Sequence, residues 1–123
     1  MKQIYKILLT ILFFLLLFLF TYESIYSNND NLNVIQGKLE ICSTNPMTGY
    51  YRDGYCNTGP DDLGTHTVCA TMTDEFLNFT KNKGDNLSTP NRSFPGLQSG
   101  DNWCICALRW KQAYDSNVDP PVN

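Results

Sequence analysis

The chain opens with a continuous apolar block, whereas its later hydrophobic residues alternate with polar ones. Residues 7–20 are nearly all Leu, Phe and Ile, and Lys2 and Lys6 precede them. A basic start followed by such a block is typical of a signal peptide, while a helix that crosses a bilayer needs about 17 residues or more. Because only Ser24 and Ser27, both with bulky neighbours, offer a cleavage site, we expect residues 7–22 to be an uncleaved signal anchor.

This anchor sets the expected topology. The positive-inside rule keeps the basic residues 1–6 in the cytoplasm and exports the remainder of the chain. We therefore predict a single-pass membrane protein whose membrane partner is contacted through residues 7–22. Secretion after signal cleavage is the alternative.

A polar linker over residues 23–32 separates the apolar block from a domain that we place at residues 33–123. Residues 34–41 are compatible with one short strand that Gly37 interrupts. Residues 44–64 carry six Gly and Pro residues, a density that predicts an ordered, turn-rich loop. Residues 66–72 alternate between apolar and polar side chains, which predicts a strand.

The second half of the domain repeats the order of strand and helix. Thr73 is a good N-cap for a helix that Gly84 ends. After another Gly- and Pro-rich loop, residues 103–108 are compatible with a strand or with the entry to a helix, and residues 109–116 have helical spacing. The pattern predicts an α+β fold: a small, single, compact and loop-rich domain preceded by an N-terminal hydrophobic helix.

Charge excludes one class of partner. The chain has nine basic and twelve acidic residues; without Lys2, Lys6 and Glu23, the soluble part has seven and eleven. Nucleic-acid binding needs clustered Lys and Arg, so we exclude it. The sequence identifies neither a protein partner nor a small-molecule partner, and it assigns no reaction.

Thiol and imidazole groups are concentrated in residues 42–69 and 94–110, which hold all five cysteines, the single histidine and both tryptophans. Zinc is the first functional interpretation, since Cys and His are its usual ligands. The spacing is not that of a standard zinc site, because no Cys-x-x-Cys pair occurs. The candidate metal ligands are Cys56, His66, Cys69, Cys104 and Cys106.

A reactive thiol is the second functional interpretation. A cysteine near His66 or Arg109 could have its pKa lowered and become a nucleophile. Asp61 or Asp62 could orient the imidazole, as the third group of a triad does. The candidate catalytic residues are Cys69, His66, Asp53 and Arg52.

Two structural explanations compete with this chemistry. In an exported domain the thiols should pair, and five cysteines allow two disulfides and one leftover thiol with undetermined connectivity. Free cysteines also pack as small hydrophobic residues. The sequence leaves both explanations open.

Several long motifs resemble a small, mostly bacterial family known as domain of unknown function 2237. The resemblance runs from about Asn33 to Val122 and implies a compact α and β domain without an established activity. Its relatives are mostly intracellular, which favours packed cysteines over disulfides. The motifs that carry it are Cys-Ser-x-x-Pro-Met-Thr-Gly from Cys42, Arg-Asp-Gly-x-Cys from Arg52, Thr-Gly-x-x-Asp-x-Gly-x-His-x-Val-Cys-Ala from Thr58, Asp-x-Leu-Ser-Thr-Pro from Asp85 and Phe-Pro-Gly-Leu-x-x-Gly-Asp-x-Trp-Cys-x-Cys-Ala from Phe94.

The chain differs from these relatives at both ends. Family members usually lack a hydrophobic N-terminus and usually continue past Pro120-Pro121-Val122 with another apolar segment, so we expect the C-terminal tail of the family to be missing here. The leading hypothesis is a binding or structural module held by its Cys, Gly and Trp residues. The rival is a metal or thiol site, which requires His66 and at least two sulfur atoms to converge in a pocket.

Overall fold

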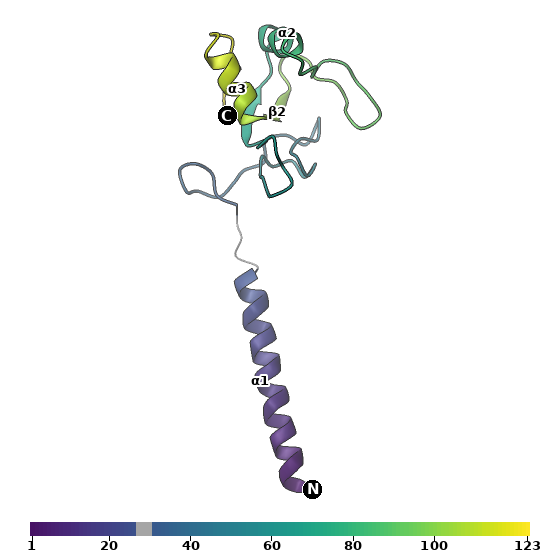
Figure 1. The fold of residues 1–123 in the computed structure, drawn as a ribbon, viewed down its shortest axis with the longest axis vertical. Coiled ribbons are helices and arrows are strands. Elements are labelled where there is room, and N and C mark those ends of the chain that lie inside the picture. Colours follow the sequence, from purple (N-terminus) through teal and green to yellow (C-terminus); the bar gives the residue numbers. More distant parts are fainter. Residues whose placement is uncertain (27–30) are drawn as a thin grey trace. The chain divides into compact units, whose positions relative to one another are not determined.

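The structure is a computed structural model that describes residues 1–26 and 31–123 (Figure 1). The chain divides into two compact units, residues 1–32 and residues 33–123. The first unit is helix α1, Lys2–Tyr26, which takes in part of the stretch expected to be linker. Its residues 2–21 have a mean hydropathy of 2.5 and are not buried against the rest of the chain. In length and composition this helix could cross a membrane, and a signal sequence has the same properties.

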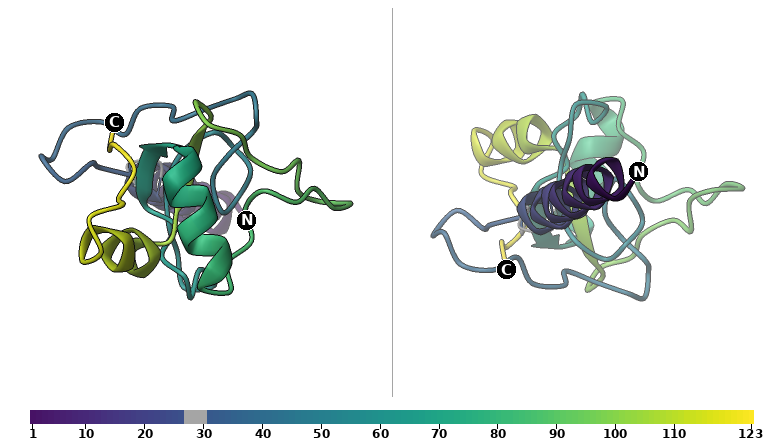
Figure 2. Two further views of the ribbon diagram at one scale, coloured as in Figure 1. Left: turned by 90° about the horizontal axis from the view of Figure 1, so that it is seen from above. Right: turned by 90° about the horizontal axis from the view of Figure 1, so that it is seen from below.

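The second unit has the predicted α+β fold. Strand β1, Val68–Thr71, is followed by helix α2, Asp74–Asn82, then by strand β2, Asn102–Ile105, and helix α3, Ala107–Tyr114. The two strands pair antiparallel, with Cys69 opposite Cys104. Within this unit, α2 and α3 lie on one side of the strands and the loops of residues 33–66 lie on the other (Figures 1 and 2).

The core lies between the strands and the two helices. Because side chains alternate across a strand, Ala70 of β1 and Trp103 and Ile105 of β2 face this side. The amphipathic helix α2 adds Phe76, which is fully buried. The buried hydrophobic cluster consists of Ala70, Met72, Phe76, Leu77, Leu97, Trp103, Ile105 and Ala113.

The C-terminal residues add a second, short line of hydrogen bonds at the outer edge of β1. The backbone N–H of Thr71 donates to Pro121 O at 2.9 Å, and that of Asn123 donates to Cys69 O at 2.9 Å. Trp110 Nε1 donates to Pro120 O at 3.1 Å and ties α3 to the same segment. The outer edge of β1 is therefore covered rather than open.

Helix α2 has the predicted ends. Its N-cap, Thr73, accepts a hydrogen bond from Phe76 N at 3.1 Å through its hydroxyl. Gly84 follows the C-cap with φ +89°, a conformation that favours glycine. Helix α3 begins two residues earlier than its spacing predicted, with Cys106 as its N-cap.

The predicted strand over residues 34–41 is wrong. Asn33 makes a local turn instead, because its side-chain Oδ1 accepts hydrogen bonds from Ile35 N at 3.1 Å and Gly37 N at 2.8 Å. Gln36 has a φ of 61°, which no extended strand allows. The side chain of Asn33 satisfies backbone groups that a strand would have paired with a neighbour.

Candidate functional site

The segment Cys42–Cys56, called here the clamped loop, folds back on itself. Cys42 N donates to Gly54 O at 2.8 Å, and Gly54 N donates to Thr48 O at 3.0 Å. At Gly49, φ is +94° and an added Cβ would lie 2.4 Å from Tyr55 O, so only glycine fits this turn. These bonds bring the two ends of the loop close together.

Two disulfides attach the clamped loop to the sheet. Cys42 bonds to Cys69 of β1, and Cys56 bonds to Cys104 of β2. A further bond joins the loop to β2, since Cys104 N donates to the buried Thr48 hydroxyl at 2.8 Å. The loop thus covers the face of the sheet opposite the helices.

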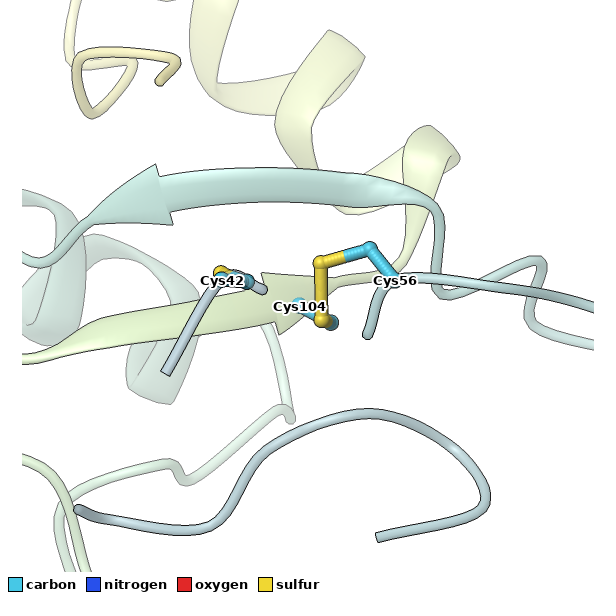
Figure 3. A group of neighbouring side chains, drawn as sticks. All are labelled: Cys42, Cys56 and Cys104. Atoms are coloured by element: carbon cyan, nitrogen blue, oxygen red, sulfur yellow. A yellow bond between two sulfur atoms is a disulfide. The ribbon is translucent and has the colours of Figure 1, made fainter. Parts of the chain in front are cut away.

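The strand register explains why the two disulfides are neighbours. Cys69 O accepts from Asn123 and Cys104 N donates to Thr48, so the backbone groups of both residues point away from the partner strand. Cys69 and Cys104 therefore form a non-hydrogen-bonded pair, in which facing side chains come closest. The sulfur atoms of Cys42, Cys56 and Cys104 lie within 4.8 Å of one another (Figure 3).

His66 lies outside this sulfur cluster and pairs with Asp62. Its Nδ1 is 2.6 Å from Asp62 Oδ1, and the side chain of Asp62 is fully buried whereas that of His66 is 37% exposed. Because an ionised carboxylate only accepts hydrogen bonds, Nδ1 of the ring must carry a proton and donate it to Asp62. Of the two aspartates proposed to orient the imidazole, Asp62 does so.

The environment of Asp62 stabilises its charge. Burial alone would raise the pKa of this carboxyl, but hydrogen bonds from the backbone and ring of His66 and from the Thr58 hydroxyl outweigh it. The pKa of Asp62 is therefore lowered below its ordinary value. The pair holds the imidazole in one orientation.

The ring of Tyr50 stacks on His66, with 5.8 Å between centroids and 22° between planes. The Tyr50 hydroxyl donates to Asp61 O at 2.9 Å, which fixes the ring. Tyr51 packs edge-on against Tyr50 at 5.1 Å. The two tyrosines are 40% and 47% exposed, so an ordered aromatic surface borders the histidine.

The remaining candidate residues have structural contacts. The Arg52 guanidinium carbon lies 4.9 Å from the centre of the Trp103 ring, a cation–π arrangement. The Asp53 carboxylate accepts hydrogen bonds from Tyr55 N and from the side chain of Asn57, each at 3.1 Å. Both residues order the clamped loop.

The five proposed metal ligands do not come together as one set. Cys56, Cys69 and Cys104 are in disulfides, His66 is bonded to Asp62, and Cys106 is a half-buried free thiol. Cys42, which the sequence-based set omitted, joins the sulfur cluster instead. The alternation of residues along β1 puts Cys69 on the face that the loops cover, and this was visible in the sequence. That Cys42 is the partner of Cys69 follows only from the path of the loop.

The sequence matches the model of the family described as "Uncharacterized protein conserved in bacteria (DUF2237)" over residues 32–123. The chain belongs to this family. No curated protein matches it. The DUF2237 region includes both disulfides and the Asp62–His66 pair, and it begins after helix α1. The clamped loop, the sulfur cluster and the Asp62–His66 pair are therefore all parts of the DUF2237 domain.

Proposed function

We propose that this chain is a membrane-anchored, exported binding module in which the clamped loop, together with His66, presents the partner-facing surface. The observation that carries the proposal is the pair of disulfides, which use four of the five cysteines. Disulfides persist in oxidising compartments and are rare in the cytosol. Helix α1 supports the same topology, since it supplies an apolar stretch of spanning length behind a basic N-terminus.

The binding surface that we propose consists of Tyr50, Tyr51 and His66. Tyrosines on an ordered backbone provide contact area at a small cost in side-chain entropy, and they are enriched where proteins meet partners. The disulfides hold the backbone of this loop, and the Tyr50 hydroxyl has a partner in Asp61. His66 Nε2 adds one polar group whose direction is fixed by Asp62.

Topology and redox state can be tested together in intact cells that express the full chain. A membrane-impermeant amine reagent should label the exposed Lys81 and Lys83 and should not label Lys2 or Lys6. Alkylation without reduction should modify one thiol, and alkylation after reduction should modify five. A labelled N-terminus with a protected domain, or five free thiols before reduction, would refute the proposal.

The fate of helix α1 decides between the anchor and the secreted form. The anchored form predicts that the intact mass of the extracted protein includes Met1 and that the chain stays in the membrane fraction at high salt. A shorter mass in the medium would establish secretion after cleavage instead.

The binding surface is tested with a photo-reactive amino acid placed at Tyr51 of the membrane-displayed chain. The matched control places the same group at Leu108 of α3, which is 78% exposed. Crosslinks from position 51 that disappear with Tyr50→Ala, with none from position 108, are expected. Equal crosslinking from both positions, or none from position 51, would contradict the assignment of this surface.

A further inference from the structure

The same cysteines that clamp the loop can also be viewed as a set of metal ligands. We propose that the domain, once both disulfides are reduced, binds one zinc ion through Cys42, Cys56, Cys69 and Cys104. This site differs from the set predicted by the sequence because it includes Cys42 and excludes His66 and Cys106. It concerns the reduced chain, so it does not depend on export.

The sulfur positions are close to those of a tetrahedral site. Zinc binds thiolate sulfur at about 2.3 Å, which separates neighbouring sulfurs by about 3.8 Å in a tetrahedron. The sulfurs of Cys42, Cys56 and Cys104 already lie within 4.8 Å of one another, and Cys69, the fourth ligand, is the disulfide partner of Cys42. Three of the four ligands are therefore already clustered, and rotation of the Cys69 side chain, once its bond to Cys42 is broken, would complete the set around one ion.

The backbone that carries these four residues is held by bonds that reduction does not break. Cys69 and Cys104 are paired across the β1–β2 ladder. The loop remains attached through the bond from Cys104 N to Thr48 Oγ1, and its ends remain closed by the bond from Cys42 N to Gly54 O. These bonds favour a fold of the reduced chain in which the four thiols are neighbours, and metal binding would stabilise that fold further.

Ligand chemistry and burial select the kind of ion. Four thiolates are soft ligands that favour zinc over calcium or magnesium. Cys56 and Cys104 are 6% and 2% exposed, and a set of four protein sulfurs leaves no position for water or substrate. The site is therefore a closed, structural one, in which the ion replaces the disulfides as the link between loop and sheet.

The two states interconvert by balanced steps. Each disulfide reacts with a phosphine and water to give two thiols and one phosphine oxide, so two equivalents release all four thiols. These four thiols then bind Zn²⁺ as thiolates and release four protons. Binding should consequently weaken as the pH falls.

The test uses the full chain in detergent micelles, reduced with a phosphine under argon and titrated with Co²⁺. We expect the visible bands of a tetrahedral cobalt thiolate to saturate at one ion per chain and to disappear when Zn²⁺ is added. The oxidised chain, titrated in parallel, should show no such bands. Absence of the bands in the reduced chain, or their presence in the oxidised chain, would overturn the proposal.

Variants and a direct count of ligands identify the residues. Cys42→Ser and Cys104→Ala should each abolish the cobalt bands, whereas the matched controls Cys106→Ser and His66→Ala should keep them. X-ray absorption at the zinc edge of the wild-type chain should give four sulfur neighbours, a result that does not depend on the folding of any variant. A nitrogen neighbour, or loss of binding in either control, would overturn the assignment.

Discussion

Removal of the Cys56–Cys104 disulfide is the most informative perturbation of this fold, because it breaks the covalent link between the clamped loop and β2. The bridge closes a loop with a sequence separation of 48 residues. In the chain-entropy treatment, a loop of this length stabilises the folded state by about 4 kcal/mol relative to the unlinked chain. Small domains have a total stability of roughly 5–15 kcal/mol, so the expected loss is a large part of the whole.

The assay is urea unfolding of the oxidised full chain in micelles, followed by the fluorescence of Trp103 and Trp110. Cys56→Ala with Cys104→Ala is the appropriate double variant, because both sites are buried and serine would place a hydroxyl there without a partner. The matched control is Cys106→Ala, which removes a thiol but no bridge and should change the stability by less than about 1 kcal/mol.

The second bridge gives an independent check on the reasoning. Cys42–Cys69 has a separation of 27 residues, for which the same treatment gives about 3.5 kcal/mol. Its double alanine variant should therefore lose slightly less stability than the Cys56–Cys104 variant. If either double variant remained within about 0.5 kcal/mol of wild type while its parent was shown to be fully oxidised, the entropic account of the clamped loop would be refuted.

Three further predictions concern other parts of the chain. Because the lowered pKa of Asp62 favours its ionised form in the folded state, the stability that it contributes is present above the ordinary carboxyl pKa and is lost as the pH falls through the lowered value. Asp62→Asn should flatten the acid limb of an unfolding-versus-pH profile, and an unchanged limb would contradict this. Thr73→Ala removes the N-cap of α2 and should lower the free energy of unfolding by about 1 kcal/mol, measured in urea against the exposed control Asn78→Ala. Leu15→Arg places a charge in the middle of α1 and should disfavour membrane insertion by about 3 kcal/mol, measured as the fraction of chain resistant to carbonate extraction.

Local sequence signals predicted most of the regular structure in the domain. The alternation of residues 66–72 predicted β1, and the cap at Thr73 and the glycine at position 84 predicted the ends of α2. These signals are local, because a strand period and a helix cap depend on neighbouring residues. The prediction of a strand at residues 34–41 was wrong because Asn33 forms a turn through its own side chain. The apolar residues in this stretch do not indicate that turn.

The site was harder to predict because its contacts join distant parts of the chain. Cys42–Cys69 and Cys56–Cys104 depend on the path of the clamped loop, and connectivity cannot be deduced from the spacing of cysteines. The His66–Asp62 pair was accessible to sequence reasoning, since its members are four residues apart. The sulfur cluster was not, because it requires the register that places Cys69 opposite Cys104.

The order of the bridged cysteines along the chain has a consequence for shedding. The bridges Cys42–Cys69 and Cys56–Cys104 interleave, so every peptide bond between residues 42 and 104 lies inside at least one of them. A single proteolytic nick in this region, including one at an exposed residue of the clamped loop such as Tyr51, leaves both fragments covalently joined. One cut releases the bridged body of the domain from α1 only if it falls between that helix and Cys42. In the anchored form that we propose, a protease that cuts between α1 and Cys42 would therefore release the domain in one step, whereas a cut within the bridged region would not release it until the disulfides were reduced.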